Sequence, residues 1–182
     1  QAGTSHYLGQ NFAKASGIKF TNQAGEVEFG YTTSWGTTTR LIGALIMVHS
    51  DDDGLRLPPR VAPKQVVILP VIPKPEHTEA MQQYAAQIED QLKQLRYHHY
   101  PLGVTLDKRD IRGGDKNWEW IKKGIPVRIE VGPRDREANA VTLYRRDKAH
   151  NERETVPLAN LNARLFEILD EIQANYLAIA TQ

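Results

Sequence analysis

The chain has 182 residues, 40% of them hydrophobic, with 23 Lys and Arg against 22 Asp and Glu, which leaves a net charge of +1. This length can bury a core in one or two domains, and the small net charge excludes a global field that would draw the chain to nucleic acid. The absence of cysteine excludes disulfides, thiolate zinc sites and a cysteine nucleophile. The apolar run 41–48 is far shorter than the roughly 20 residues of a membrane span, and no signal peptide is visible, so we expect no membrane segment.

The first elements point to antiparallel sheet. Residues 18–21 and 27–32 alternate apolar and polar side chains around the turn residues 22–25, which predicts a hairpin.

A hydroxyl-rich turn and one arginine then precede the apolar run 41–48. A helix start carries unpaired N–H groups and partial positive charge, and Arg40 adds a fork of donors, so this segment suits a phosphate or nucleotide. The alternative is that Ser34 or Thr37 only caps a core helix.

Pro58, Pro59 and Pro63 form a rigid basic stretch before the apolar run 66–69. We place a domain boundary there, with one domain at 1–63 and a second at 64–182. The expected elements of the second domain are strand 66–71, helix 76–96, strand 103–107, helix 116–123, strands 126–131 and 140–146, and helix 158–179. Alternating strands and helices predict an α/β domain with a mixed sheet.

Both long helices carry apolar stripes of helical period. The residues expected in the core are Met81, Tyr84, Ala85, Ile88, Leu92 and Leu95 on the first, and Leu158, Leu161, Leu165, Leu169, Ile172 and Tyr176 on the second. Trp118 and Trp120 lie two positions apart and cannot both face inward, so we expect one of them to meet solvent or a partner.

Four segments together resemble one family. Residues 1–14, 34–49 and 55–68 are similar to the end of a prolyl-tRNA synthetase catalytic domain, and 107–135 are similar to the anticodon-binding domain of its archaeal and eukaryotic type. The resemblance implies part of a class II antiparallel sheet followed by a mixed α/β anticodon-binding domain. It also implies a ligase of protein biosynthesis that activates proline with ATP to prolyl-adenylate and transfers it to proline tRNA.

The resemblance assigns roles to residues of the first segments. Arg40 is the candidate catalytic residue, and ATP would contact Gln1, Thr4, Thr38 and Arg40, with Gln1 also near Mg²⁺. Proline would be held by His6, Ser34, Trp35 and Gly36. Arginine suits a triphosphate because it stays charged and binds two oxygens at once. From the residues alone, Trp35 could instead pack in a core.

For the second domain, the resemblance places anticodon contacts at Arg109, Asp110, Lys116, Trp118, Glu119 and Lys123. Cations and aromatics suit unpaired bases, and residues 108–123 hold six bases against three acids, although such runs are often solvated faces. The chain departs from its relatives at Gly113, Asp115 and Asn117, where Trp118 takes over the missing aromatic role.

The first two signature motifs of the family do not lie within these 182 residues, so we expect the chain alone not to activate proline. For the full-length enzyme the resemblance implies a cytoplasmic homodimer. Two other readings stay open: a non-catalytic RNA-binding accessory module with the anticodon-binding fold, and a small-molecule α/β domain. We also expect residues 1–63 to be the less stable part, with unpaired sheet edges and exposed apolar surface.

Overall fold

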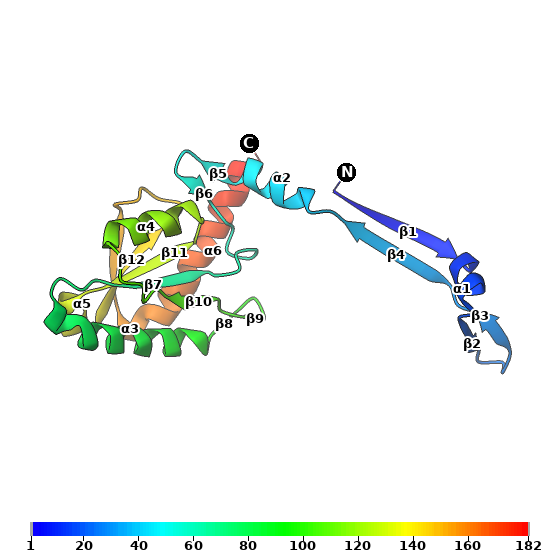
Figure 1. Ribbon diagram of the computed structural model, residues 1–182, viewed down its shortest axis with the longest axis horizontal. Coiled ribbons are helices and arrows are strands. Elements are labelled where there is room, and N and C mark those ends of the chain that lie inside the picture. The colour runs from blue at the N-terminus through cyan, green and yellow to red at the C-terminus, as the bar shows by residue number, and fades with distance from the viewer. Residues whose placement is uncertain (1, 182) are drawn as a thin grey trace. The chain divides into compact units, whose positions relative to one another are not determined.

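A computed structural model describes residues 2–181. The internal contacts divide the chain into two compact units, Gln1–Met47 and Val48–Gln182. Figure 1 labels the helices and strands of both units.

The first unit is built from two short antiparallel ribbons. β1 (Gly3–Gly9) pairs with β4 (Thr32–Thr37), and β2 (Lys19–Thr21) pairs with β3 (Val27–Phe29), with α1 (Asn11–Ser16) between β1 and β2. The second pair confirms the predicted hairpin. Its turn is held by Asn22, whose Oδ1 accepts hydrogen bonds from the backbone N–H groups of Ala24 and Glu26, both at 2.9 Å.

The first unit has almost no core of its own. Among its described residues Ala13 is the one buried hydrophobic residue, while large apolar side chains such as Tyr7, Phe12 and Trp35 are exposed. Helix α2 (Arg40–Val48), which runs to the unit boundary, has no buried residue. Two-stranded ribbons leave both edges unpaired, so this unit exposes the apolar surface and sheet edges expected for residues 1–63.

The second unit contains a five-stranded mixed sheet in the order β10-β7-β11-β12-β13. β10 (Val104–Leu106), β7 (Val66–Pro70) and β11 (Val127–Val131) run parallel, while β12 (Ala140–Arg145) and β13 (Arg153–Pro157) are antiparallel to their neighbours. This arrangement confirms the predicted α/β class with a mixed sheet.

The core of this unit lies on one face of the sheet, under α3 (Thr78–Lys93) and α6 (Leu161–Ala180). Both predicted stripes are buried there, with Leu95 and Leu158 at the margin. α4 (Gly113–Lys122) packs on the opposite face, where Trp120 covers Val67, Leu69 and Ile125. Shorter elements complete the unit: α5 (Pro133–Glu137), β8 (Arg96–Tyr97), β9 (Tyr100–Pro101) and two 3-10 turns (Pro75–His77, Leu158–Asn160).

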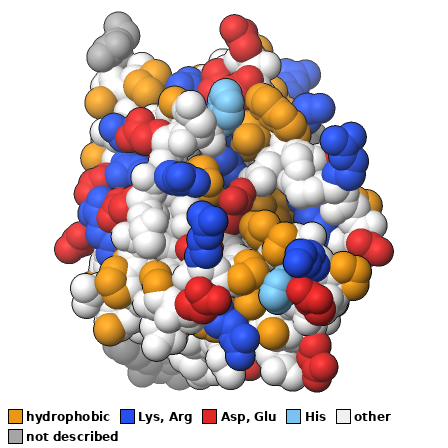
Figure 2. All heavy atoms as spheres, turned by 90° about the vertical axis from the view of Figure 1, so that its left-hand side faces the viewer, with side chains coloured by type: hydrophobic (Ala, Val, Ile, Leu, Met, Phe, Trp, Pro, Cys, Tyr) orange, Lys and Arg blue, Asp and Glu red, His pale blue; other side chains and the backbone are white. Residues whose placement is uncertain are grey.

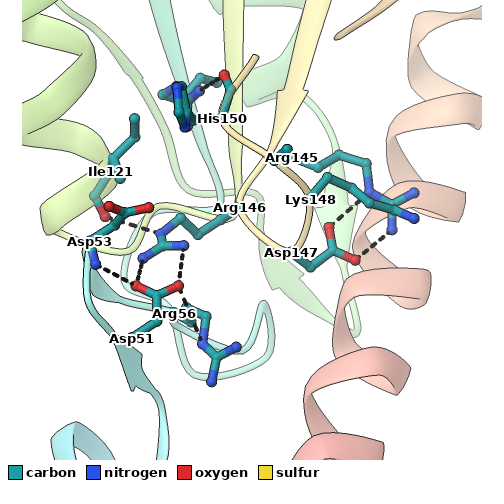
Figure 3. A pocket seen from close by; sticks show the side chains of 11 residues that line it. Asp51, Asp53, Arg56, Ile121, Arg145, Arg146, Asp147, Lys148 and His150 are labelled. Carbon is teal, nitrogen blue, oxygen red and sulfur yellow. Dashed lines mark hydrogen bonds and ion pairs between the residues drawn. The ribbon is translucent and has the colours of Figure 1, made fainter. Parts of the chain in front are cut away.

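Residues 48–63 pack against this sheet domain. The hairpin of β5 (Ser50–Asp51) and β6 (Gly54–Leu55) meets the end of α4 so closely that a Cβ at Gly54 would lie 2.6 Å from Lys122 Cα, and one at Gly124 2.6 Å from Leu55 Cβ. Figure 3 shows the Arg146 guanidinium facing the Asp51 carboxylate, with two bonds of 2.8 and 2.5 Å. The internal contacts therefore place the boundary between the two units after Met47. The domain boundary near residue 63 stays a prediction.

The surface and the helices of the described residues show two further features. Figure 2, which faces the side of the second unit where α5 lies, shows Lys and Arg interspersed with Asp and Glu, with apolar side chains between them. Within residues 2–181 none of the helices combines the length and the apolar character that crossing a bilayer requires.

Candidate functional site

The β1–β4 ribbon aligns four of the eight residues assigned to proline and ATP. Thr4 lies opposite Gly36 and His6 opposite Ser34 in the antiparallel register, and directly opposed residues project from the same face of a ribbon. A side chain at Gly36 would crowd this face, since its Cβ would lie 3.1 Å from Thr4 Oγ1. The structure therefore brings Thr4, His6, Ser34 and Gly36 together on one face.

Trp35 lies elsewhere. It pairs with Ser5, so the two-residue period of the strand directs its indole to the opposite face from His6 and Ser34. Trp35 is 76% exposed, which also removes the alternative that it packs in a core of this unit. Within the described residues, the ribbon does not bring the indole and the imidazole to the same side.

The start of α2 carries the nucleotide candidates Thr38 and Arg40. The backbone N–H of Arg40 donates to Thr38 Oγ1 at 3.3 Å, so the hydroxyl at the helix start is that of Thr38 and not of Ser34 or Thr37. The Arg40 side chain is exposed and makes no ion pair within residues 2–181. The N–H groups of Leu41 and Ile42 donate to the backbone oxygens of Thr38 and Thr39, so it is the exposed guanidinium of Arg40 that fits a phosphate here. Gln1, assigned to ATP and Mg²⁺, lies outside the described residues.

In the second unit a groove of about 600 Å³ opens at the carboxyl ends of the three parallel strands. This edge is where open α/β sheets present ligand sites. The groove is lined by the segment after β7, by residues 107–111 after β10, by Glu130 of β11 and by one side of α4, including Lys116 and Asn117. It therefore contains three of the predicted anticodon residues: Arg109, Asp110 and Lys116.

A buried carboxylate organises one wall of this groove. Asp107 accepts hydrogen bonds from Arg109 Nε at 3.0 Å, from Arg109 Nη2 at 2.7 Å and from the Trp120 indole N–H at 2.9 Å. The Arg109 guanidinium holds the pKa of this carboxyl well below its ordinary value, against the opposing effect of burial. Arg109 also donates to Glu119 at 2.7 Å. Three N–H donors of Arg109 are thus used within the protein, and these bonds connect the loop after β10 to α4.

Lys116 differs from the other predicted contacts because it is buried. Its ammonium donates to the backbone oxygen of Asp107 at 3.4 Å. Lys116 projects from the inward side of α4, so its buried ammonium lines the inner wall of the groove. Lys123, by contrast, is exposed, with its Nζ 4.7 Å from the centre of the Trp120 ring and 3.8 Å from Glu119.

Trp118 faces away from this groove. It is 43% exposed and lies 5.7 Å, ring centre to ring centre, from His150, whereas Trp120 is half buried in the apolar cluster on this face of the sheet. The expectation that one of the two tryptophans is available to solvent is confirmed. The structure thus separates Trp118 from Arg109 and Lys116.

A chain of polar side chains that was not expected from the sequence runs between these regions. Arg128 Nε donates to Asn117 Oδ1 at 3.1 Å, and Asn117 Nδ2 donates to Glu130 Oε1 at 2.7 Å. A signal was present, because Arg128 and Glu130 occupy alternate positions of the otherwise apolar strand 127–131 and so must share one face of it.

Comparison with known proteins identifies the kind of domain. Residues 65–168 match the family model described as "Anticodon binding domain". The chain is 55% identical over 176 residues to a proline–tRNA ligase of Protochlamydia amoebophila, covering 97% of this chain and 35% of that protein. It is 54% identical over 173 residues to proline–tRNA ligase 2 of Anaeromyxobacter dehalogenans, covering 95% and 34%, and 47% identical over 182 residues to a proline–tRNA ligase of Bdellovibrio bacteriovorus, covering 100% and 36%. The chain therefore spans about a third of the length of the curated relatives it matches.

Proposed function

Because the chain belongs to the anticodon-binding domain family and is homologous to proline–tRNA ligases over nearly its whole length, we propose that it is the part of a proline–tRNA ligase that binds the anticodon of proline tRNA and supplies one portion of the ATP and proline site. The observation that carries the proposal is the groove at the carboxyl ends of β7, β10 and β11, which lies within the residues that the family model covers.

The groove has the chemistry that unpaired RNA bases require. Arg109 and Asp110 line it and offer N–H donors and carboxylate oxygens to base edges. Glu119, which accepts from Arg109, and the exposed Lys123, 3.8 Å from Glu119, lie beyond its lining residues. Single-stranded bases bind proteins through such edge contacts and through stacking, with phosphates held by local cations. This suits a chain whose net charge is only +1, since affinity then comes from a local patch and not from the whole surface.

The first unit supports the catalytic half of the proposal. Thr4, His6, Ser34 and Gly36 share a ribbon face, and Arg40 presents a guanidinium without an internal ion pair in the described part of the chain. In the proposed reaction the carboxylate of proline attacks the α-phosphate of ATP, which forms prolyl-adenylate and releases pyrophosphate. Arg40 would orient and neutralise that phosphate, and Thr4 and Thr38 would hold the nucleotide by neutral hydrogen bonds.

Binding of proline tRNA to the 182-residue chain tests the anticodon half. At fixed salt we expect a tRNA with an exchanged anticodon to bind at least about tenfold more weakly. If Lys123 contacts one phosphate, Lys123→Gln should reduce the slope of log K against log salt by about 0.7, the value for a single strand. Equal affinity for both tRNAs would contradict anticodon recognition.

Exchange of pyrophosphate into ATP, dependent on proline, tests the catalytic half of the proposal. The isolated chain should show no exchange, and robust exchange would overturn our account of the missing motifs.

An RNA-binding accessory module is the competing proposal. It has no use for an unpaired Arg40 at a helix start, or for Thr4 and His6 aligned on the ribbon face. In a full-length relative, Arg40→Ala at the matching position should abolish exchange while tRNA binding is retained. Full exchange activity in that variant would favour the accessory reading of these residues.

A further inference from the structure

Arg146 lies where three segments of the second unit meet. It directly follows β12 and is 6% exposed. Its Nε donates to the backbone oxygen of Ile121 at 3.2 Å, and its two terminal nitrogens donate to the Asp51 carboxylate at 2.8 and 2.5 Å (Figure 3). One guanidinium therefore joins the end of α4 to the β5–β6 hairpin.

The ion pair suits both of its partners. The last carbonyl groups of a helix carry partial negative charge, so a cation at Ile121 stabilises the end of α4. A buried guanidinium needs an opposite charge, which Asp51 supplies to Arg146. The hydrogen bonds from Arg146 hold the pKa of Asp51 below its ordinary value, against the opposing effect of burial. Both groups are therefore charged in the folded protein near neutral pH.

The hairpin also fits the end of α4 through its backbone. The N–H of Leu57 donates to the backbone oxygen of Gly124 at 3.1 Å. Gly54 has a φ of +131°, and a Cβ there would lie 2.6 Å from Lys122 Cα. The hairpin thus cannot move closer to α4 without a clash, and the ion pair keeps it from moving away.

The helix connects this contact to the groove. α4 has ten residues, which corresponds to about 15 Å, and Lys116 and Asn117 of its first half line the groove. Trp120, one position before Ile121, donates to Asp107 at 2.9 Å and so connects the same helix to the loop after β10. Because a helix moves nearly as a rigid body, a shift of its end at Ile121 changes the distances across the groove.

We propose that Arg146 and Asp51 are positioning residues for anticodon recognition: their ion pair fixes α4 against the β5–β6 hairpin and so holds the groove in the shape that discriminates the anticodon. Neither side chain lines the groove, and Asp51 lies outside residues 65–168, which match the family model. The inference rests on the proposed tRNA-binding function and adds to it a part of the chain that precedes the matched domain.

The test compares the affinities of the full 182-residue chain for proline tRNA and for a tRNA with an exchanged anticodon, at one salt concentration. The double variant Arg146→Met, Asp51→Leu removes both charges together, and replacing a buried ion pair by apolar side chains is often neutral for stability. We expect its melting temperature to stay close to that of the wild type and the ratio of the two affinities to fall at least about threefold. A pair that served only stability would leave that ratio unchanged.

Two further variants complete the test. Gly54→Ala pushes the hairpin away from Lys122 while both charges remain, and it should lower the affinity ratio as well. The matched control is Arg164→Met with Glu154→Leu, which removes another ion pair made of two hydrogen bonds, of 2.7 and 3.1 Å, between α6 and β13. Because this pair touches neither α4 nor the hairpin, its loss should leave the ratio unchanged.

The outcomes separate this inference from the proposed function. If the wild-type chain binds both tRNAs equally, the proposed function fails, and this inference fails with it. If the wild type discriminates and the folded double variant discriminates equally well, the positioning role alone is overturned. Gly54→Ala decides in its place if the double variant does not fold. A loss of discrimination in the control pair would also overturn the positioning role, since the effect would then not depend on α4.

Discussion

The two units of the chain differ in where their stability and their chemistry lie. In the first unit the candidate ATP and proline residues stand on a two-stranded ribbon whose described residues bury one hydrophobic side chain, Ala13. In the second, the candidate RNA contacts stand on the edge of a sheet with a continuous core of strands and two long helices. The side chains of a groove on a packed sheet are held in place by the core of their own domain. The side chains of a ribbon with unpaired edges are held in place only where another surface packs on the ribbon.

The largest expected contrast is in backbone protection. In hydrogen exchange followed by mass spectrometry, the amides of β7 and β11 should open with free energies close to that of global unfolding, about 5 to 15 kcal/mol for a domain. The amides of β1 and β4 in the isolated chain should open with about 0 to 2 kcal/mol. Similar protection in both units would contradict the contrast between an exposed ribbon and a packed sheet.

A pair of matched isoleucines sharpens the contrast at single-residue level. Ile168→Ala in α6 removes a side chain that is 0% exposed and should lower the free energy of unfolding by about 2 to 5 kcal/mol, because the core cannot fully close over the cavity. Ile42→Ala in α2, where the side chain is 60% exposed, should change it by less than about 0.5 kcal/mol. Urea denaturation followed by circular dichroism measures both.

Asp107→Asn probes the groove wall and its pH dependence. Loss of the charged acceptor should lower the free energy of unfolding by about 2 kcal/mol near neutral pH. Since Arg109 keeps the folded-state pKa of Asp107 below its unfolded value, the charge stabilises the fold above about pH 4 and this contribution is lost as the pH falls toward the folded-state pKa.

The wild type and this variant should therefore converge in stability as denaturation is repeated at decreasing pH below about 4. A stability difference that is the same at pH 7 and pH 3 would contradict an ionised Asp107 as the organising group.

The smallest expected effect on stability is that of Arg40→Ala. The side chain is exposed and makes no ion pair within the described residues, so thermal denaturation should shift by no more than about 0.5 kcal/mol in free energy of unfolding. A larger loss would mean that Arg40 stabilises the unit, which would weaken its assignment to a ligand.

Most of the second unit was predictable because its periodicities are strong. The stripes that begin at Met81 and Leu158 and the apolar run at Val66 are buried as expected, with Leu95 and Leu158 only partly so, and strands alternating with helices led to a mixed sheet. The strand β13, Arg153–Pro157, was not expected. Its side chains are mostly polar because it is an edge strand that pairs on one side only, so its sequence resembles a loop.

The site was less predictable than the fold. The contacts in segment 107–123 were assigned from a family resemblance, which its cations and aromatics suit. The sequence does not show that Lys116 faces inward or that Trp118 and Trp120 lie on opposite sides of α4. The helix begins at Gly113, three residues earlier than expected, which adds almost one turn before Lys116. The pairing of Trp35 with Ser5 likewise depends on strand register, which spacing along the chain alone does not give.

The close fit of residues 50–57 against Gly124 has a practical result for anyone who isolates the sheet domain of the second unit. A shortened chain that begins at Lys64, where the proline-rich stretch ends, would delete Asp51 and leave the buried Arg146 without its carboxylate, a change that costs about 3 to 5 kcal/mol for a buried pair. A chain cut before His49 keeps that anchor, and it should be the version that can be purified in a folded form.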